Sequence, residues 1–326
     1  MAFARASVIA GVGSYLPEKV VTNDDMAKIV DTSHDWIVAR TGIEQRHFAS
    51  DDQVTSDLAT EAAQQALQDA GLTPADIGLI IVATVTPDKT FPSTAVFVQQ
   101  KLGCPVGIAF DVSAACSGFL YALNLAHNFI AAGEPKHALV IGAEKLSCFL
   151  DFNDRGTCVL FGDGAGAVVL SQGTAQTRDD GRGVLATYLA ADGTKAEHLY
   201  ADGGPSSTGT VGLVRMNGRE VFRNAVEEIS NSVFEVAERG DVGPADIDWF
   251  VPHQANVRII ESCAKRLKID PDKVIVTIAK HGNTSSASIP LALREAIDDG
   301  RIKEGQLLAF AALGGGLAWG SALIRL

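Results

Sequence analysis

The chain has 326 residues, of which 47% are hydrophobic and 20% charged, so it can bury a large core in one or two domains. Its formal net charge of −12 argues against a general nucleic-acid-binding protein, because neutralising phosphates requires clustered Lys and Arg. Five scattered cysteines without a C-x-x-C pair exclude a disulfide scaffold, and the absence of a Cys/His cluster argues against a zinc site.

Targeting and membrane segments are not expected. The first ten residues lack the apolar core of a signal peptide. No apolar run reaches the roughly 18 residues that a membrane helix needs. We therefore expect a cytoplasmic protein that neither spans nor binds a membrane.

Apolar strands and periodic helices alternate along the chain, which predicts an α/β fold with mainly parallel sheets. A polar stretch at 171–183 is the best candidate for a joint, so we expect two halves, residues 1–175 and 176–326. The predicted strands cover 8–13, 79–82, 138–142, 165–170, 184–189, 247–251 and 307–312. The predicted helices begin near Thr22 and Thr32 and cover 56–70, 119–130 and 220–238.

Short repeats relate the two halves. Pro74-Ala-Asp-Ile77 recurs 170 residues later, and Ile130-Ala-Ala-Gly133 resembles a stretch 167 residues later. A glycine turn with its strand, 165–170, resembles 319–324 at an offset of 154. Each match is short, but their common order favours a duplicated architecture with a longer insertion in the first half.

The first candidate for chemistry is Cys116, which lies among small residues between an apolar run and a predicted helix. A helix N-terminus can lower the pKa of a thiol there, although an isolated Cys is more often a packed core residue. An offset of 167 pairs Cys116 with Asn283, so we expect the two at equivalent turns. His253 follows the strand 247–251, at a strand end where α/β proteins bind ligands. Together the three favour a catalytic site between the halves.

Motifs along nearly the whole chain resemble the β-ketoacyl-[acyl-carrier-protein] synthase III family, the initiating condensing enzymes of type II fatty-acid synthesis. The most specific are the Cys116 stretch, Val251-Pro-His-Gln-Ala-Asn256 and His281-Gly-Asn283. The resemblance implies a thiolase-like fold of five layers, α/β/α/β/α, and a homodimer. It implies an acyltransferase that condenses an acyl-CoA, with acetyl-CoA the expected primer, and malonyl-[acyl-carrier-protein] through an acyl-Cys intermediate. Neither a metal nor a redox cofactor is expected.

The same resemblance assigns roles to individual residues. The implied catalytic triad is Cys116, His253 and Asn283, with the N–H groups of Cys116 and Gly315 as the oxyanion hole. The resemblance also implies that CoA is bound by Trp36, Arg40, Arg155 and Asn256. It implies an acyl pocket that receives Phe91 from the dimer partner. The implied carrier-protein docking residues are Arg223, Arg258, Lys265, Arg266 and Lys268. Arg219 departs from the family pattern, which often has a smaller polar residue there, so CoA contacts at that position stay open.

Three alternatives remain at this stage. The nearest is a condensing enzyme of secondary metabolism or signalling that accepts a longer or branched primer. A non-catalytic acyl-binding scaffold and a cysteine hydrolase are the others; the intact Cys116, His253 and Asn283 set argues against the scaffold.

Overall fold

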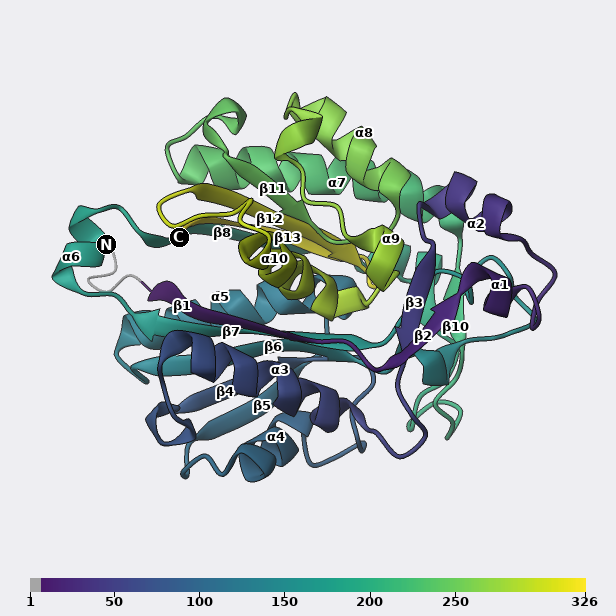
Figure 1. Ribbon diagram of the computed structural model, residues 1–326, viewed down its shortest axis with the longest axis horizontal. Helices are drawn as coiled ribbons and strands as arrows, with labels where there is room; N and C mark the ends of the chain where they lie inside the picture. The colour runs from purple at the N-terminus through teal and green to yellow at the C-terminus, as the bar shows by residue number, and fades with distance from the viewer. Residues whose placement is uncertain (1–6) are drawn as a thin grey trace.

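The computed structural model describes residues 7–326 and shows helices and sheets stacked in five layers (Figure 1). Residues 1–6, part of the segment in which no signal peptide is expected, lie outside the described residues. Within the described range, no helix is long and apolar enough to cross a bilayer. That range also contains no group of three or more His, Cys, Asp or Glu residues arranged to hold a metal.

The first sheet has five strands. Its order is β1 (Ser7–Tyr15), β7 (Gly164–Gln172), β6 (His137–Glu144), β4 (Leu79–Ala83) and β5 (Ile108–Val112). β4 pairs in parallel with β5 and β6, whereas β7 pairs antiparallel with β1 and β6. Every residue of β4 is buried, as its continuous apolar sequence predicts for a strand covered on both faces.

The second sheet has four strands in a matching arrangement. Its order is β11 (Trp249–Pro252), β12 (Leu307–Gly314), β13 (Ala318–Arg325) and β8 (Gly183–Ala191). β11 and β12 are parallel, and the other pairs are antiparallel. A fifth strand, the counterpart of β5, is reduced to a single parallel bridge between Phe250 and Val274.

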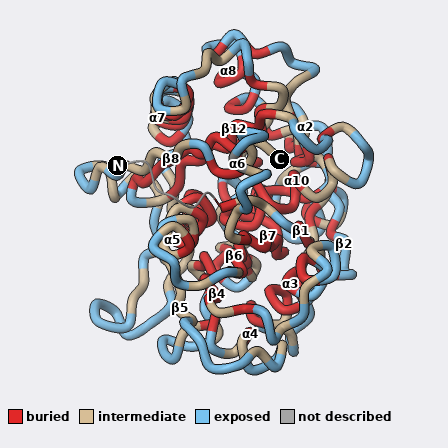
Figure 2. Tube along the Cα trace, turned by 90° about the vertical axis from the view of Figure 1, so that its left-hand side faces the viewer, coloured by how far each residue is buried: buried red, intermediate tan, exposed pale blue. Residues whose placement is uncertain are grey.

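Helices cover both faces of each sheet. From bottom to top in Figure 1, the first helical layer is α3 (Thr55–Ala70) with α4 (Thr94–Leu102), outside the first sheet. The middle layer, between the sheets, is α5 (Gly118–Ala132) with α10 (Ser288–Asp298). The last layer, outside the second sheet, is α7 (Gly218–Arg239) with α8 (Val257–Leu267). One apolar cluster fills the middle layer, and two others lie under the outer helices. Figure 2 shows the buried residues concentrated in the sheets and their facing helices. The predicted five-layered α/β fold is therefore confirmed.

A smaller cap sits at one end of the layers. It combines β2 (Lys19–Thr22) and β3 (Gln45–Phe48) with α1 (Asn23–Met26), α2 (His34–Thr41) and α9 (Ile278–His281). Thr22 and Ser33 cap α1 and α2 through their hydroxyls, as the sequence predicts. A second small sheet, β9 (Leu199–Ala201) with β10 (Val214–Met216), forms in the irregular stretch after β8, and α6 (Ala175–Asp179) lies between β7 and β8.

The duplication is visible at the two central helices, and it corrects one prediction. A short 3₁₀ turn precedes each helix, Ala115–Ser117 before α5 and Ser285–Ala287 before α10. Ala115 and Ser285 both have positive φ, 45° and 50°. The offset at this point is therefore 170, so the counterpart of Cys116 is Ser286. The predicted equivalence of Cys116 and Asn283 is wrong, because the 167 offset belongs to the helix ends farther along the chain.

Candidate active site

Cys116 lies in the 3₁₀ turn between β5 and α5, and only 6% of it is exposed. Burial raises the pKa of its thiol to about 12, and a hydrogen bond from the Ser285 side chain opposes this rise. The lowering expected from the helix N-terminus is therefore outweighed by desolvation. The free protein holds Cys116 as a neutral thiol, which must lose its proton when it reacts.

His253 directly follows β11, at the carboxyl end of that strand. Its Nδ1 lies 2.6 Å from Ser288 Oγ, a hydroxyl that also accepts from the Gln254 N–H. Among the described residues Ser288 Oγ has no other acceptor for its proton, so we assign that proton to Nδ1 and the proton of the ring to Nε2. Burial lowers the His253 pKa to about 3, so the imidazole is neutral at pH 7 and can donate one hydrogen bond.

Asn283 lies just after α9 and is held through its backbone. Its N–H donates to Leu160 O at 2.9 Å, and its carbonyl accepts from Gly162 N at 3.0 Å. Its side-chain Oδ1 accepts from Ser285 N at 2.9 Å. Because the acceptor end is engaged in this way, the side chain presents its Nδ2 donors to the cavity that it lines.

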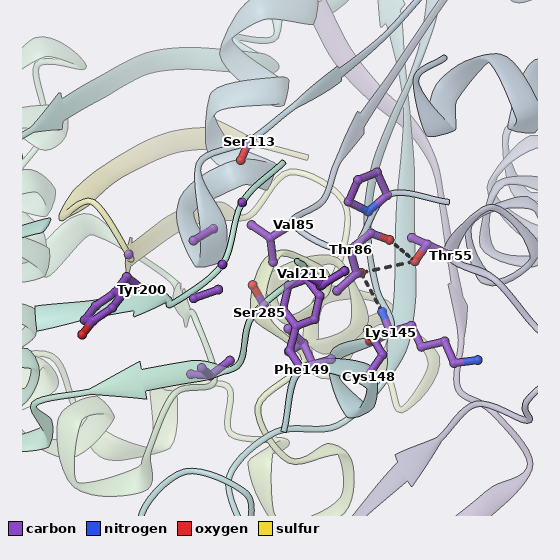
Figure 3. Close-up of a pocket in the computed structure, with 18 of the residues that line it drawn as sticks. Thr55, Val85, Thr86, Ser113, Lys145, Cys148, Phe149, Tyr200, Val211 and Ser285 are labelled. Atoms are coloured by element: carbon purple, nitrogen blue, oxygen red, sulfur yellow. Dashed lines mark hydrogen bonds between the residues drawn. The ribbon is translucent and has the colours of Figure 1, made fainter. Parts of the chain in front are cut away.

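Two cavities meet at Cys116. The smaller, about 490 Å³, is lined by Cys116, His253 and Asn283 together with Trp36, Arg40 and Asn256. The larger, about 1080 Å³, is lined by Cys116, Ser285 and Gly315 and by the wall around Thr55, Val85 and Thr86 (Figure 3). The thiol thus lies where the smaller cavity, with the neutral donors of His253 and Asn283, joins the larger and mostly apolar cavity.

The turn between β12 and β13 approaches the nucleophile from the second half. An ideal Cβ on Gly314 would lie only 2.6 Å from Cys116 N, so a side chain there would displace the Cys116 backbone. Gly315 lies next to it and lines the larger cavity. The backbone of this turn is therefore near enough to Cys116 to be considered with the predicted oxyanion hole.

The outer end of the smaller cavity is cationic. The guanidinium carbons of Arg40 and Arg155 lie 4.5 and 5.0 Å from the centroid of the Trp36 ring. Asn256 caps α8 and donates from Nδ2 to Arg40 O at 3.0 Å. Arg258 donates to Ala39 O at 2.8 Å. Three predicted CoA residues, Trp36, Arg40 and Asn256, and the predicted docking residue Arg258 therefore line this cavity, and Arg155 lies against Trp36 beside it.

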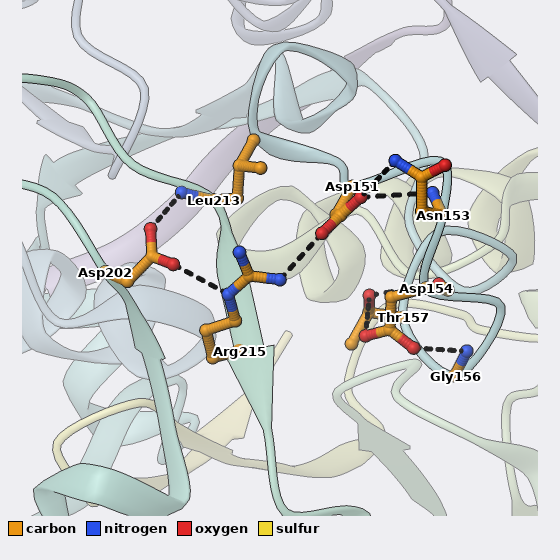
Figure 4. A network of polar contacts seen from close by, with 8 residues as sticks. All are labelled: Asp151, Asn153, Asp154, Gly156, Thr157, Asp202, Leu213 and Arg215. Carbon is orange, nitrogen blue, oxygen red and sulfur yellow. Dashed lines mark hydrogen bonds and ion pairs between the residues drawn. The ribbon is translucent and has the colours of Figure 1, made fainter.

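The Arg155 segment is fixed by a network that the sequence did not reveal (Figure 4). Arg215, on β10, lies 2.7 Å from both Asp151 and Asp202. Arg215 holds the pKa of Asp151 below its usual range, and the Leu213 N–H together with Arg215 does the same for Asp202. Asp154 closes the turn by accepting from Gly156 N and Thr157 Oγ1. Only the polar composition of 192–218 could have pointed to it, because ion pairs between distant segments leave no local pattern.

The remaining predicted residues lie elsewhere. Lys265, Arg266 and Lys268 are exposed near the far end of α8 and line neither cavity, and Arg223 on α7 pairs with Glu220. Phe91 is 82% exposed in the loop between β4 and α4 and lines neither of the two cavities at Cys116. Sequence reasoning also missed Ser285 and Ser288, which contact Cys116 and His253, although both lie close to the recognised Asn283 motif.

Comparison with known proteins identifies the family of the chain. Residues 110–193 and 237–326 match family profiles described as 3-oxoacyl-[acyl-carrier-protein (ACP)] synthase III and its C-terminal part. A β-ketoacyl-[acyl-carrier-protein] synthase III of Caulobacter vibrioides is 60% identical, covering 98% of this chain and 99% of the relative. The synthase III structure from Aquifex aeolicus superposes with a TM-score of 0.93 at 49% identity, covering 98% of this chain and all of the other. That from Pseudomonas aeruginosa has a TM-score of 0.92 at 41% identity over 98% of both chains. The chain therefore belongs to the β-ketoacyl-[acyl-carrier-protein] synthase III family.

Proposed function

We propose that the protein performs the decarboxylative Claisen condensation that initiates fatty-acid synthesis. It joins an acyl-CoA primer, with acetyl-CoA the expected one, to malonyl-[acyl-carrier-protein]; the products are β-ketoacyl-[acyl-carrier-protein], CO₂ and CoA. The observation that carries the proposal is the meeting of Cys116, His253 and Asn283 in one buried cavity. A thiol that faces two neutral donors suits thioester exchange followed by enolate stabilisation.

The first half-reaction is acyl transfer to Cys116. The sulfur attacks the acyl-CoA carbonyl, the C–S bond to CoA breaks, and the proton lost by Cys116 is balanced by the one gained by the CoA thiol. The N–H groups of Cys116 and Gly315 are the proposed donors to the oxyanion. The larger cavity beside Cys116 would receive the acyl chain.

The second half-reaction is decarboxylation and carbon–carbon bond formation. His253 Nε2 and Asn283 Nδ2 would donate to the malonyl thioester carbonyl, where negative charge develops as CO₂ leaves. The carbanion attacks the acyl carbon on Cys116, and the released thiolate takes up a proton. His253 suits this role because a neutral imidazole donates without needing to ionise in a dry cavity.

The cationic entrance is the proposed site for the CoA nucleotide. Arg40 and Arg155 offer guanidinium groups to phosphates, and Trp36 offers an indole face to adenine. The Trp36 ring and Arg155 are 5.0 Å apart, which is too close for an aromatic ring between them. Adenine binding there would require the two side chains to separate. Asn256 is proposed to bind near the pantetheine.

The proposed assembly is a cytoplasmic homodimer in which Phe91 completes the partner's acyl cavity. β5 is an edge strand beside exposed apolar residues, including Val106 and Ile108, and Phe91 is largely exposed as well. Such an edge favours pairing with a second copy. The five cysteines are all free, which fits a reducing compartment.

Intact-mass analysis with a panel of acyl-CoAs tests the acylation step. One acyl group should appear on the wild-type protein, and Cys116→Ala should carry none. Normal labelling of Cys116→Ala would contradict the assignment of the nucleophile. A larger signal with branched or longer primers than with acetyl-CoA would contradict the proposed primer.

Asn283→Asp tests the second step with a side chain of the same shape. Asp keeps the acceptor for Ser285 N but replaces the Nδ2 donor with an oxygen, which repels the developing enolate. We expect acylation to survive and malonyl decarboxylation to fall by at least about a hundredfold, in line with loss of one oxyanion donor. Release of labelled CO₂ measures it, and full activity would show that Asn283 has no such role.

A related enzyme of a specialised pathway is the second candidate. The priming β-ketosynthase of the R1128 polyketide pathway superposes with a TM-score of 0.91 at 34% identity, and the larger cavity of about 1080 Å³ exceeds the needs of an acetyl group. The primer panel separates this candidate from the first. A cysteine hydrolase would instead release free acid without malonyl thioester, and a non-catalytic scaffold would not acquire the acyl mass.

A further inference from the structure

Glu144 is a fully buried carboxyl group that the proposed mechanism does not use. It is the last residue of β6 and is 0% exposed. Its Oε2 accepts from Val85 N at 3.0 Å, from Thr84 Oγ1 at 3.1 Å and from Thr86 Oγ1 at 2.9 Å. Its Oε1 has one hydrogen-bond partner among the described residues, Ser286 Oγ at 3.1 Å.

The hydroxyl protons around Glu144 can be assigned. Thr84 Oγ1 accepts from Thr86 N, and Thr86 Oγ1 accepts from Lys145 N. The two threonine hydroxyls lie 3.3 Å apart, and Thr86 Oγ1 also lies 3.2 Å from Thr55 Oγ1. For each threonine the contact with Oε2, at 3.1 and 2.9 Å, is shorter than these, so we assign both protons to Oε2. Ser286 Oγ lies 2.9 Å from Ala83 O and 3.1 Å from Oε1, and either oxygen can accept its single proton. We assign the proton to Ala83 O, the shorter contact. No hydroxyl proton is then left for the contact at Oε1. The arrangement is complete if Oε1 itself carries a proton and donates it to Ser286 Oγ.

Among the residues that the structure describes, no cation pairs with Glu144 to balance a charge. Lys145, the next residue, directs its Nζ to Ser50 O and Gln53 O instead. The other titratable groups that face this region are Cys116 and Cys148, and a negative Glu144 would raise the pKa of both thiols further. Burial raises the Glu144 pKa to about 7, against the opposing effect of its hydrogen bonds. A neutral acid fits this environment.

The Glu144 contacts support two segments that lie beside Cys116, the Ser285–Ser286 turn and the 84–86 segment. Ser286 follows Ser285, whose side chain hydrogen-bonds to Cys116 and whose φ of 50° needs a firm support. This turn packs directly on β6, because an ideal Cβ on Gly142 would lie 2.3 Å from Ser286 O. On the other side, Val85 and Thr86 line the larger cavity (Figure 3).

We propose that Glu144 is a positioning residue that acts as a neutral carboxylic acid, whose Oε1–H donates to Ser286 Oγ and holds the Ser285–Ser286 turn against Cys116. The same group fixes the Thr84–Thr86 wall through Oε2. The inference concerns the setting of Cys116, and it rests on the proposed function only for the acyl-transfer readout.

Two variants, Glu144→Gln and Glu144→Leu, test whether position 144 acts as a neutral hydrogen-bond donor or only fills space. Gln can accept the three donors through its oxygen and donate to Ser286 through its amide, whereas Leu can do neither. At pH 6 we expect Glu144→Gln to form acyl-Cys116 within about threefold of the wild-type rate, and Glu144→Leu to be at least about tenfold slower, one lost hydrogen bond being worth about that factor. Equal losses in folded Gln and Leu variants would overturn the proposal.

Alkylation of Cys116 by iodoacetamide gives a readout that does not depend on the proposed reaction. Above pH 7 ionisation of Glu144 removes the donor and raises the thiol pKa, so the ratio of wild-type to Glu144→Gln rates should fall by at least about threefold between pH 6 and pH 8.5. A flat ratio would overturn the proposal. If acyl transfer fails in the wild type but this ratio falls, the proposed function is wrong and the Glu144 inference stands.

Asp163→Asn is the matched control, because Asp163 is also buried but meets only donors. Its oxygens accept from Ser147 N, Ser147 Oγ and Ala49 N. In Asp163→Asn the side-chain NH₂ group would face a backbone N–H that now donates to a carboxylate oxygen. Asp163→Asn should therefore melt at a lower temperature than the wild type, and Glu144→Gln should not. If Glu144→Gln does not fold, the infrared spectrum of wild type with ¹³C-labelled Glu decides. A protonated-carboxyl band at pH 6 that disappears by pH 8.5 supports the proposal, and its absence at pH 6 overturns it.

Discussion

At the scale of single residues, burial controls the chemistry of this site more than charge does. Burial holds Cys116 and His253 in their neutral forms at pH 7, with pKa values of about 12 and 3, and raises the pKa of Glu144 to about 7. Among the described residues none of the three has an ion-pair partner, and hydroxyls, amides and apolar atoms surround them. A site of this kind favours reactions in which charge develops only transiently.

The buried His253 makes stability depend on pH. Its pKa is about 3 in the folded protein, against 6.5 for an ordinary exposed histidine, so below pH 6.5 the unfolded chain takes up a proton that the folded protein does not. Stability is therefore lost as the pH falls, by about 2 kcal/mol between pH 7 and pH 5. Urea unfolding should show this loss in wild type but not in His253→Gln. The same pH dependence in both proteins would contradict it.

The roles of individual residues were only partly accessible from sequence. Cys116, His253 and Asn283 carry recognisable motifs, and the structure brings them to one cavity. The supporting residues Ser288, Arg215 and Glu144 have no motif of their own, because each acts through a contact with a distant segment. The sequence shows that Cys116 precedes a helix, which can lower the pKa of a thiol, but it does not show the burial that raises this pKa.

At the scale of elements, the cap is organised by one buried cation. Arg46 on β3 is 0% exposed and has no carboxylate partner among the described residues. It donates to Val21 O, Asn23 Oδ1 and Val159 O, and burial lowers its pKa to about 10. β3 also contacts α9, which precedes Asn283. The guanidinium thus joins the cap to the segment that positions the catalytic amide.

Arg46→Met tests this connection. The apolar side chain leaves three buried acceptors unpaired, and we expect a loss of about 2–4 kcal/mol in the free energy of unfolding. Arg239→Met is the control, because Arg239 pairs with Glu235 at the surface and should contribute under about 1 kcal/mol. Chemical denaturation measures both, and equal effects would show that Arg46 is not a structural centre of the cap.

Element boundaries were predictable to within a few residues where periodicity was strong. The helix expected at 56–70 is α3, Thr55–Ala70, and that expected at 220–238 is α7, Gly218–Arg239. The irregular region after β8 hid two short strands, β9 and β10, because three-residue strands leave no alternation to detect. The duplication was visible, but its register at Cys116 was not, since insertions shift the offset between one element and the next.

At the scale of the whole molecule, the exposed cations of α8 contrast with a net charge of −12. If they dock an acidic carrier protein, Lys265→Glu should raise the KM for malonyl-[acyl-carrier-protein] about tenfold at low salt, leave the KM for acyl-CoA unchanged, and lose most of its effect at high salt. Lys303→Glu, an exposed change on another surface, is the control. Equal effects of the two changes, or an unchanged KM, would place the carrier elsewhere.

The unequal edges of the two sheets limit how this molecule can associate. The first sheet ends in β5, whereas the corresponding edge of the second is closed by the Phe250–Val274 bridge. If β5 pairs with β5 of a second copy, the twofold contact covers the same edge in both chains. No equivalent edge is then left for a third chain to pair with. A strand edge that would otherwise invite fibre growth would then terminate assembly at two subunits.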